Sequence, residues 1–292
     1  NIQYFNKRLS NTLIGTILLI LTYLFFSVME LTAKELALRF NPFLIVFARY
    51  LSQLILLLII FNKQFKTHLK SNHKPLQILR GALLMITTCF MFTGLAYLQF
   101  AENISIYMIG PVITTILAIL ILKEKISFTQ ILVVIIGLIG ALIIASPNKG
   151  AFNYAVIFPF LAALCFAFFT ISTKFLNTSD SNQTTLLFTA ITGTILSLPS
   201  IIYFWKWPDL YDTLLMFCLG FLATAGHFLF IEALKVINAS FAAPFVYLTV
   251  LLAAFWGYIL YNEVPSQNTF IGAFLIITSG FIITQFRKKN LK

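Results

Sequence analysis

The sequence predicts an all-α membrane protein with ten transmembrane helices, arranged as two inverted five-helix repeats. Of its 292 residues, 60% are hydrophobic and 10% are charged, whereas soluble domains are roughly 45–50% apolar and 25% charged. A water-soluble fold of this size could not bury so much apolar surface, so a cytosolic enzyme, a disordered protein and a secreted disulfide scaffold are excluded. The other two observations are ten apolar runs and an internal repeat.

Each apolar run is long enough to cross a bilayer, whose core of about 30 Å needs about 20 residues of α-helix. The connections between the runs are short, so no soluble domain is expected between them. The ten predicted spans are 11–33, 43–62, 77–98, 103–122, 127–146, 154–174, 184–205, 212–234, 239–261 and 267–286.

The basic residues predict the orientation of these spans, because cytoplasmic loops are enriched in Lys and Arg. With ten spans, only Lys34, Arg39, Lys149 and Lys206 fall on one side, and every other Lys or Arg except Arg49 falls on the other. Both termini are therefore expected in the cytoplasm. The net charge of +11 reflects this pattern, and no nucleic-acid partner is expected.

An internal repeat appears when the chain is shifted by 139–140 residues. The matched pairs are Lys34 with Lys174, Gly81 with Gly220, and Glu124 with Glu263. Residues 1–150 and 151–292 then form two repeats of five helices each, and an odd number inverts the second repeat in the membrane. Inverted repeats are typical of secondary transporters, which bind substrate near the midplane between the halves.

Ionisable residues inside predicted spans are candidates for a binding site, since charge is costly in a bilayer. Glu30 and Arg49 lie on adjacent antiparallel spans. They either face a cavity and bind the two ends of a zwitterion, or form a structural ion pair. His227 lies in the middle of the eighth span, where the repeat matches it to Thr88. It either relays protons or is a neutral imidazole bonded to a neighbouring helix.

Two helix interruptions point to the same cavity. Gly110-Pro111 and Pro244 lie inside the fourth and ninth predicted spans, and proline removes a backbone hydrogen bond and kinks a helix. In transporters such interrupted helices border the substrate site. Tyr107 and Tyr247 lie close by, and each either presents a ring and a hydroxyl to the ligand or packs in the core.

Glu124 and Glu263 each end a span, where a carboxylate can accept hydrogen bonds from the N-terminus of the next helix. Small residues in the fifth and tenth spans either pack these two helices on the rest of the fold or join two copies in a homodimer; they are Gly137, Gly140, Gly272 and Gly280. The sequence has neither a Cys/His metal motif nor a phosphate-binding P-loop, so we expect no metal, no cofactor and no ATP coupling within this chain.

Motifs along the whole chain resemble the drug/metabolite transporter superfamily, and specifically its ten-helix EamA-type members. In the first half these are Asn41-Pro42-Phe43, Arg80-Gly81, Ala101-Glu102, Gly110-Pro111 and Lys123-Glu124; in the second they are Ala239-Ser240, Ala243-Pro244, Tyr247 and Asn262-Glu263-Val264-Pro265. One departure is Thr249-Val250 at the repeat counterpart of Pro111.

This resemblance implies a basket of eight helices around a central cavity, with helices five and ten outside it. It makes Glu124 and Glu263 gate or turn residues. It implies transport of small metabolites, often amino acids, across a bacterial inner (plasma) membrane, and one branch of the superfamily imports S-adenosylmethionine. Two other functions stay open from the residues alone: a membrane enzyme acting on lipid and a passive metabolite channel.

Overall fold

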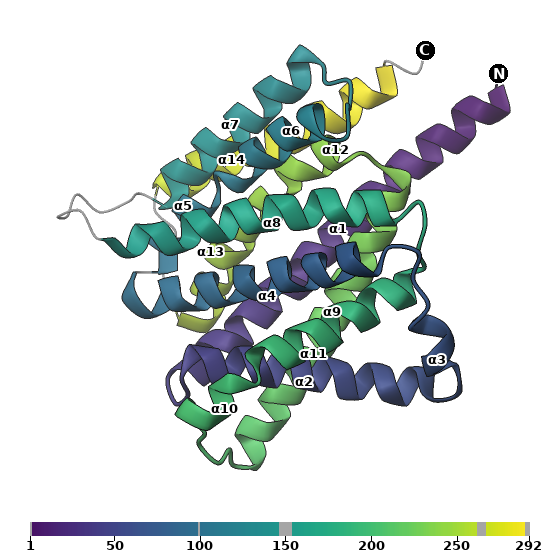
Figure 1. The fold of residues 1–292 in the computed structure, drawn as a ribbon. Coiled ribbons are helices and arrows are strands. Elements are labelled where there is room, and N and C mark those ends of the chain that lie inside the picture. Colours follow the sequence, from purple (N-terminus) through teal and green to yellow (C-terminus); the bar gives the residue numbers. More distant parts are fainter. Residues whose placement is uncertain (1, 99, 146–153, 262–266, 290–292) are drawn as a thin grey trace.

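The computed structural model describes residues 2–98, 100–145, 154–261 and 267–289, and throughout these ranges the regular structure is helical (Figure 1). The helices of the first half are α1 (Ile2–Ala37), α2 (Pro42–Phe61), α3 (Phe65–His68), α4 (Lys74–Tyr97), α5 (Phe100–Tyr107), α6 (Gly110–Leu120) and α7 (Phe128–Ala145), with a 3-10 turn η1 (Asn62–Gln64). Those of the second half are η2 (Tyr154–Val156), α8 (Ile157–Leu176), α9 (Asn182–Ser197), α10 (Pro199–Phe204), α11 (Leu210–Val236), α12 (Ala239–Ala242), η3 (Ala243–Tyr247), α13 (Leu248–Tyr261) and α14 (Gln267–Lys289).

The helices are apolar on their outer surface as well as inside, as expected for a fold that lies in lipid. In the described part of the chain, six spans are long and apolar enough to cross a membrane: 11–37, 42–61, 74–94, 154–176, 210–236 and 239–260. Shorter apolar helices accompany them. Large side chains such as Ile59, Phe128 and Phe274 are exposed on the outside. The protein is therefore an integral membrane protein.

Proline divides three of the predicted spans. Pro111 lies in the first turn of α6, where a missing N–H costs no hydrogen bond, so the expected span 103–122 consists of α5 and α6. Pro244 lies in η3, and the expected span 239–261 consists of α12, η3 and α13. Pro199 starts α10 and separates it from α9, a break that the sequence analysis did not anticipate.

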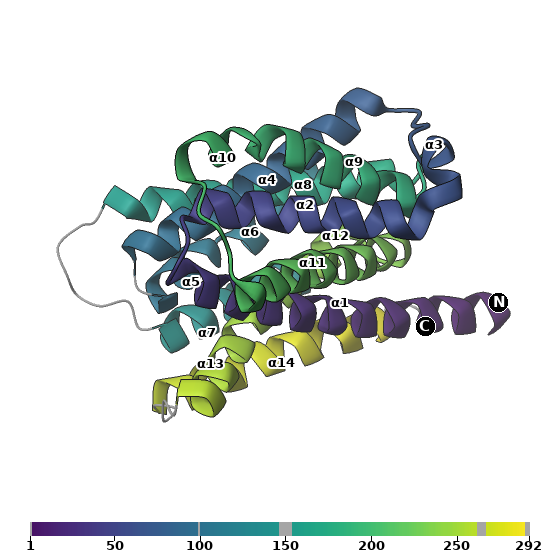
Figure 2. The same cartoon turned by 90° about the horizontal axis from the view of Figure 1, so that it is seen from below.

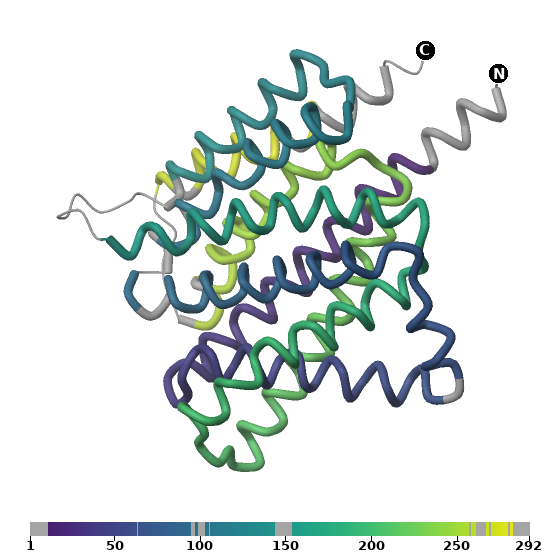
Figure 3. The backbone as a smooth tube through the Cα atoms, in the orientation of Figure 1, coloured from purple at the N-terminus to yellow at the C-terminus, as the bar shows by residue number. Residues whose placement is uncertain are grey.

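Helices from the two halves pack against each other throughout the bundle. α1 lies along α11, α4 along α8, and α7 along α14. On one flank α2 packs against both α9 and α11 and lies between them (Figure 2). Figure 3 traces the backbone of the bundle in the orientation of Figure 1. α1 begins and α14 ends at the same end of the bundle (Figures 1 and 2).

Glycine permits two of these close helix contacts. A Cβ atom at Gly220 of α11 would lie 2.6 Å from the backbone nitrogen of Gln53 in α2, and one at Gly140 of α7 would lie 2.8 Å from the carbonyl oxygen of Gly272 in α14. Real Cβ atoms do not approach other atoms so closely. Gly140 and Gly272 therefore allow α7 and α14 to pack closely against each other.

Many buried hydroxyl groups are satisfied within their own helices. Thr22, Thr88 and Thr224 each donate to the carbonyl four residues earlier, at 2.7–2.9 Å. An unpaired polar group in a bilayer costs several kcal/mol. These local bonds let the helices carry many Ser and Thr residues in an apolar environment.

Candidate functional site

A central cavity lies between helices of both halves, with a volume of about 80 Å³, which is room for several water molecules. Its lining comes from α1, α2, α4, α5, α8, α11, η3 and α13. The lining is mostly apolar, and its members are Tyr23, Phe26, Met29, Glu30, Arg49, Leu84, Thr87, Thr88, Met91, Phe92, Ile104, Tyr107, Phe166, His227, Val246 and Thr249. Of the six side chains expected to bind substrate, only Tyr247 is absent from this lining.

Arg49 lies about two turns into α2. The helix begins at Pro42 because Asn41 caps it, with the side-chain oxygen of Asn41 accepting from the Phe43 N–H at 3.0 Å. Arg49 is 1% exposed. Its Nη1 donates to Thr88 Oγ1 at 2.8 Å, and its Nη2 lies 2.9 Å from Nε2 of His227.

His227 brings α11 into the same cluster. Its ring lies between the rings of Phe26 and Phe169, at centroid distances of 4.7 and 5.7 Å. Its Nδ1 is buried and has no hydrogen-bond partner in the described part of the chain. The structure thus joins Arg49, Thr88 and His227, which the sequence analysis had assigned to three separate helices.

Glu30 lies in the cavity from α1 and is half-buried. Among the described residues no ion pair or hydrogen bond joins it to Arg49, although both line the cavity. The ion pair that one of the two alternatives predicted is therefore not made in this conformation. In the described structure the cavity therefore contains the Glu30 carboxylate, which has no ion-pair partner, and the Arg49 guanidinium, whose hydrogen bonds go to Thr88 and His227.

The two tyrosines differ in position. Tyr107 of α5 lines the cavity, and its ring lies 6.1 Å from that of Phe166. Tyr247 of η3 is fully buried, and its hydroxyl donates to the Val134 carbonyl of α7 at 2.9 Å. Its ring covers Gly137. Tyr247 therefore packs η3 against α7, while its neighbours Val246 and Thr249 face the cavity.

None of the described residues that were expected to kink or gate the helices lines the cavity. Gly110 packs against Ala163 of α8, with space for a Cβ at 3.6 Å, and Pro111 and Pro244 are both buried. Glu124 follows α6 and binds the start of α12, accepting from the backbone N–H groups of Ala239 and Ser240 at 3.1 Å. Glu263 lies outside the described residues.

Arg80 is a second buried arginine that the sequence analysis did not assign to the site. It is fully buried in α4, where Nε donates to Thr173 at 2.7 Å and Nη1 to Thr189 at 2.5 Å. Its guanidinium lies 4.3 Å from the centroid of the Phe169 ring, within range of a cation–π interaction. Its place inside the predicted span 77–98 was the signal that could have identified it.

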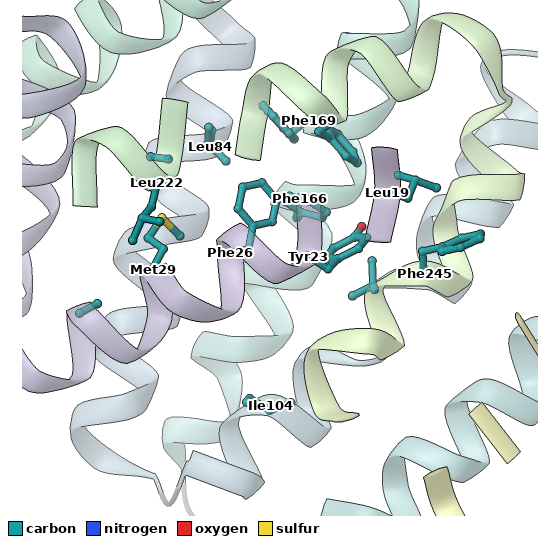
Figure 4. Close-up of a cluster of buried hydrophobic side chains, with 14 of the residues drawn as sticks. Leu19, Tyr23, Phe26, Met29, Leu84, Ile104, Phe166, Phe169, Leu222 and Phe245 are labelled. Atoms are coloured by element: carbon teal, nitrogen blue, oxygen red, sulfur yellow. The ribbon is translucent and has the colours of Figure 1, made fainter. Parts of the chain in front are cut away.

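Aromatic rings separate Arg80 from the cavity. Phe169 lies between Arg80 and His227, and it stacks on Phe166 and Phe230 at 5.4 and 6.1 Å. Figure 4 shows Phe166 and Phe169 near Phe26 and Tyr23 of α1, in the same apolar cluster. Phe166 lines the cavity, and Phe169 contacts both Arg80 and His227.

Curated proteins with similar sequences are transporters. The chain is 30% identical over 286 residues to an S-adenosylmethionine uptake transporter of Rickettsia bellii (strain RML369-C), covering 98% of each chain. It is 28% identical to the S-adenosylmethionine uptake transporter of Rickettsia prowazekii (strain Madrid E), covering 98% of this chain and 97% of that one. A riboflavin transporter of Vibrio cholerae serotype O1 (strain ATCC 39315 / El Tor Inaba N16961) is 28% identical over 215 residues, covering 73% and 72%.

The fold is also found in solved structures. A crystal structure superposes with a TM-score of 0.80 over 96% of this chain and 98% of its own length, at 16% sequence identity. A likeness at this identity supports the fold alone.

The model of the EamA-like transporter family matches residues 13–146 and again residues 153–285. These matches confirm the resemblance to the drug/metabolite transporter superfamily, and they exclude the alternative of an enzyme. The chain belongs to the EamA-like transporter family.

Proposed function

We propose that this transporter moves a zwitterionic metabolite with an aromatic or apolar body, and that S-adenosylmethionine is the first candidate. The observation that supports this most is the presence of Glu30 and Arg49 in one cavity without a bond between them. A guanidinium binds a carboxylate through paired, charge-assisted hydrogen bonds. The Glu30 carboxylate is available to a substrate cation.

The apolar part of the cavity suits the rest of such a ligand. The rings of Phe26, Phe92, Tyr107 and Phe166 line it, and aromatic rings pack well against a flat heterocycle. S-adenosylmethionine carries a carboxylate, an ammonium, a sulfonium and an adenine ring. Riboflavin has a flat ring system but neither a carboxylate nor an ammonium group, so it would leave Glu30 and Arg49 without a charged partner.

Two inverted repeats of five spans, 1–150 and 151–292, are the architecture that we propose for this transport. The family model matches the chain twice, and the helix contacts support the same division. If α1 corresponds to α8 and α4 to α11, the contact of α1 with α11 becomes that of α8 with α4, and both contacts are made. Such an exchange is expected of halves related by a two-fold axis. The ten spans would be α1, α2, α4, α5–α6, α7, α8, α9–α10, α11, α12–α13 and α14.

Alternating access of the cavity would need a gate at each side of the membrane. We assign the cytoplasmic gate to the turn between α11 and α12. Lys174 Nζ donates to the carbonyls of Leu234 and Ile237 on one side of this turn, at 2.6 and 2.5 Å, and Glu124 binds the N–H groups on the other side. Both chain termini would lie on this side of the bacterial inner membrane, which agrees with the distribution of Lys and Arg.

Counterflow tests this proposal directly. Proteoliposomes loaded with unlabelled S-adenosylmethionine should transiently accumulate labelled S-adenosylmethionine above its external concentration, because a carrier exchanges one molecule for another. A passive channel would only equilibrate the label. Lys235→Ala changes a half-exposed ion pair on the surface of α11 and should leave counterflow intact, whereas Arg49→Gln should abolish it.

Ligand binding offers an independent measurement. A ligand at about 100 times its Kd should raise the unfolding free energy by about 2.7 kcal/mol, and Glu30→Gln should weaken S-adenosylmethionine by about 10- to 100-fold through loss of a charge-assisted bond. Glu35→Gln, outside the cavity, is the matched control. If riboflavin shows counterflow and S-adenosylmethionine neither binds nor exchanges, the proposed substrate class is wrong.

A further inference from the structure

The contact between Arg49 and His227 determines which nitrogen of the imidazole carries the proton. Nη2 of Arg49 lies 2.9 Å from Nε2 of His227. A guanidinium has five N–H donors and no acceptor. Nε2 must therefore offer its lone pair, which leaves the ring neutral with its proton on Nδ1. If Nε2 carried a proton, it could not accept from Arg49, and the Arg49–His227 hydrogen bond could not form.

The surroundings of the ring contain few groups that could take or give this proton. α1 contributes Tyr23 and Glu30 to the cavity, α2 contributes Arg49, and α5 contributes Tyr107. Tyr50 of α2 does not line the cavity, but its ring lies beside the Arg49 guanidinium. From α4, Cys89 lies near Arg49, and Arg80 lies behind Phe169. α8 faces the ring with Phe169, and α9 has no titratable side chain. Glu30 is the only carboxylate among the lining residues of the described cavity.

We propose that Arg49 and His227 form a proton site that fills when an anionic substrate group binds; this rests on the proposed function. The carboxylate of the substrate takes the Nη2–H of Arg49, and the Arg49–His227 hydrogen bond breaks. The freed Nε2 lone pair takes up one proton from the bulk solution, where a buffer acid or hydronium ion gives it up, and the resulting imidazolium donates the Nε2–H in a hydrogen bond to the same carboxylate. One proton is thus bound for each carboxylate, and the transporter is coupled to the proton gradient.

Relative bond strengths favour this exchange. The Arg49–His227 bond has a charge on the donor alone, whereas a carboxylate adds an opposite charge on the acceptor and can take two N–H groups of the guanidinium at once, so it displaces the imidazole. It also lies between two cations that would otherwise repel each other. By linkage, the proton strengthens substrate binding as much as substrate strengthens proton binding. Substrate affinity should therefore rise by up to about tenfold for each unit decrease in pH.

Calorimetric titration of the purified full-length protein with S-adenosylmethionine tests the stoichiometry. Buffers with different ionisation enthalpies report the number of protons taken up, and we expect close to one per ligand bound. His227→Gln keeps an oxygen that accepts from Arg49 and should bind ligand without proton uptake. His73→Gln, in an exposed loop, should take up protons like the wild type. Decarboxylated S-adenosylmethionine lacks the anionic group and should bind without proton uptake.

Binding of S-adenosylmethionine with no proton uptake, or with unchanged uptake in His227→Gln, would overturn the proton site while leaving the proposed function intact. If S-adenosylmethionine fails to bind, the proposed substrate is wrong, and the ligand-free protein still tests the pair. Nitrogen NMR of His227 should show the neutral Nδ1–H form from about pH 8 down to pH 5, and Arg49→Gln should make the ring titrate in that range. A wild-type ring protonated on Nε2 at neutral pH would contradict the proposal.

Discussion

Glu124 binds Ser240 across a separation of 116 residues, and so fastens the end of α6 to the start of α12. Oε2 of Glu124 accepts from the Ser240 N–H at 3.1 Å and from its hydroxyl at 2.5 Å. The first N–H groups of a helix lack partners and carry a partial positive charge. The Glu124 carboxylate accepts hydrogen bonds from these N–H groups and places a negative charge beside them. Lys174 has the opposite role at the C-terminal end of α11, where its ammonium group donates to backbone carbonyls.

Replacing Glu124 by Ala should loosen the cytoplasmic side of the transporter. Loss of such a helix cap costs about 0.5–2 kcal/mol, and the closed conformation should lose this amount relative to an inward-open one. A cysteine placed at the buried residue Ala242, with the three native cysteines replaced, should react faster with a thiol reagent in inside-out vesicles. Lys235→Ala is the control on the same side. Equal labelling rates in all three proteins would show that Glu124 is not part of a gate.

Arg49 and Glu30 should be independent in stability but coupled in transport, because they share a cavity without touching. The variants Arg49→Gln and Glu30→Gln and the double variant should have unfolding free energies that add within about 0.5 kcal/mol. Each single variant should already abolish most uptake in vesicles, so the double variant should lose little more. Arg49→Lys should recover part of the activity, since lysine has the charge without the planar fork. A stability coupling well above 0.5 kcal/mol would indicate an ion pair in the dominant conformation.

Tyr247→Phe should affect stability rather than transport. The change removes the hydrogen bond from the hydroxyl to the Val134 carbonyl, which should cost about 0.5–1.5 kcal/mol, and the ring still fills the space over Gly137. Thermal unfolding and the apparent affinity for substrate, measured side by side, separate the two effects. A large loss of substrate affinity at unchanged stability would show that Tyr247 binds substrate.

The orientation can be tested with single cysteines in intact cells. Thr67 and Trp207 are both exposed and lie at opposite ends of the fold by the predicted topology. An impermeant thiol reagent should label Trp207→Cys from outside and should label Thr67→Cys only after the membrane is opened. Labelling of Thr67→Cys in intact cells would reverse the orientation and move the Glu124 gate to the outer side.

Asp180 should make stability depend on pH at the end of the bundle where α8 turns into α9. Partial burial acts to raise the pKa of Asp180, but hydrogen bonds from Ser71, Gln77 and the Asn72 backbone, with His73 nearby, outweigh it, so the pKa lies below the ordinary 3.8. A depressed pKa contributes stability that is present above pH 3.8 and is lost as the pH falls through the lower folded value.

Asp180→Asn should therefore lower the melting temperature by a constant amount at neutral and mildly acidic pH, and the difference from the wild type should shrink below about pH 4. Melting curves over this range in detergent provide the measurement. A difference that is the same at every pH would mean that the charge of Asp180 contributes nothing.

Hydropathy identified where the helices lie but not which way their side chains face. A helix that is apolar all round has no polar stripe to fix its rotation, so Tyr107 and Tyr247 could not be told apart by sequence. The distinction comes from η3, where a 3-10 turn has three residues per turn instead of 3.6. Three residues after Pro244, that difference is enough to turn the ring of Tyr247 towards α7 and away from the cavity.

Charge inside a predicted span was the more informative signal. It identified Glu30, Arg49 and His227, which all line the cavity. An ionisable side chain is costly inside a bilayer, so it is retained where polar partners, water or a ligand compensate it. The same criterion applied to Arg80, which was assigned to the cytoplasmic side on the evidence of its position near the start of a span. The partner of each charge could not be inferred, since Thr88, Thr173 and Thr189 are neutral and common in every helix.

The buried hydroxyl groups and the buried arginines differ in where their hydrogen-bond partners lie. A threonine bonded to its own helix needs no neighbour, so each helix can leave the translocon with these groups already satisfied. Arg49 and Arg80 obtain partners from α8, α9 and α11, and an arginine at the bilayer centre costs about 2.5–3.5 kcal/mol on insertion scales. Helices α2 and α4 are synthesised before those partners, so we expect their positions in the membrane to become stable only after the second half of the chain has emerged. Biogenesis of the first half is therefore completed by the second.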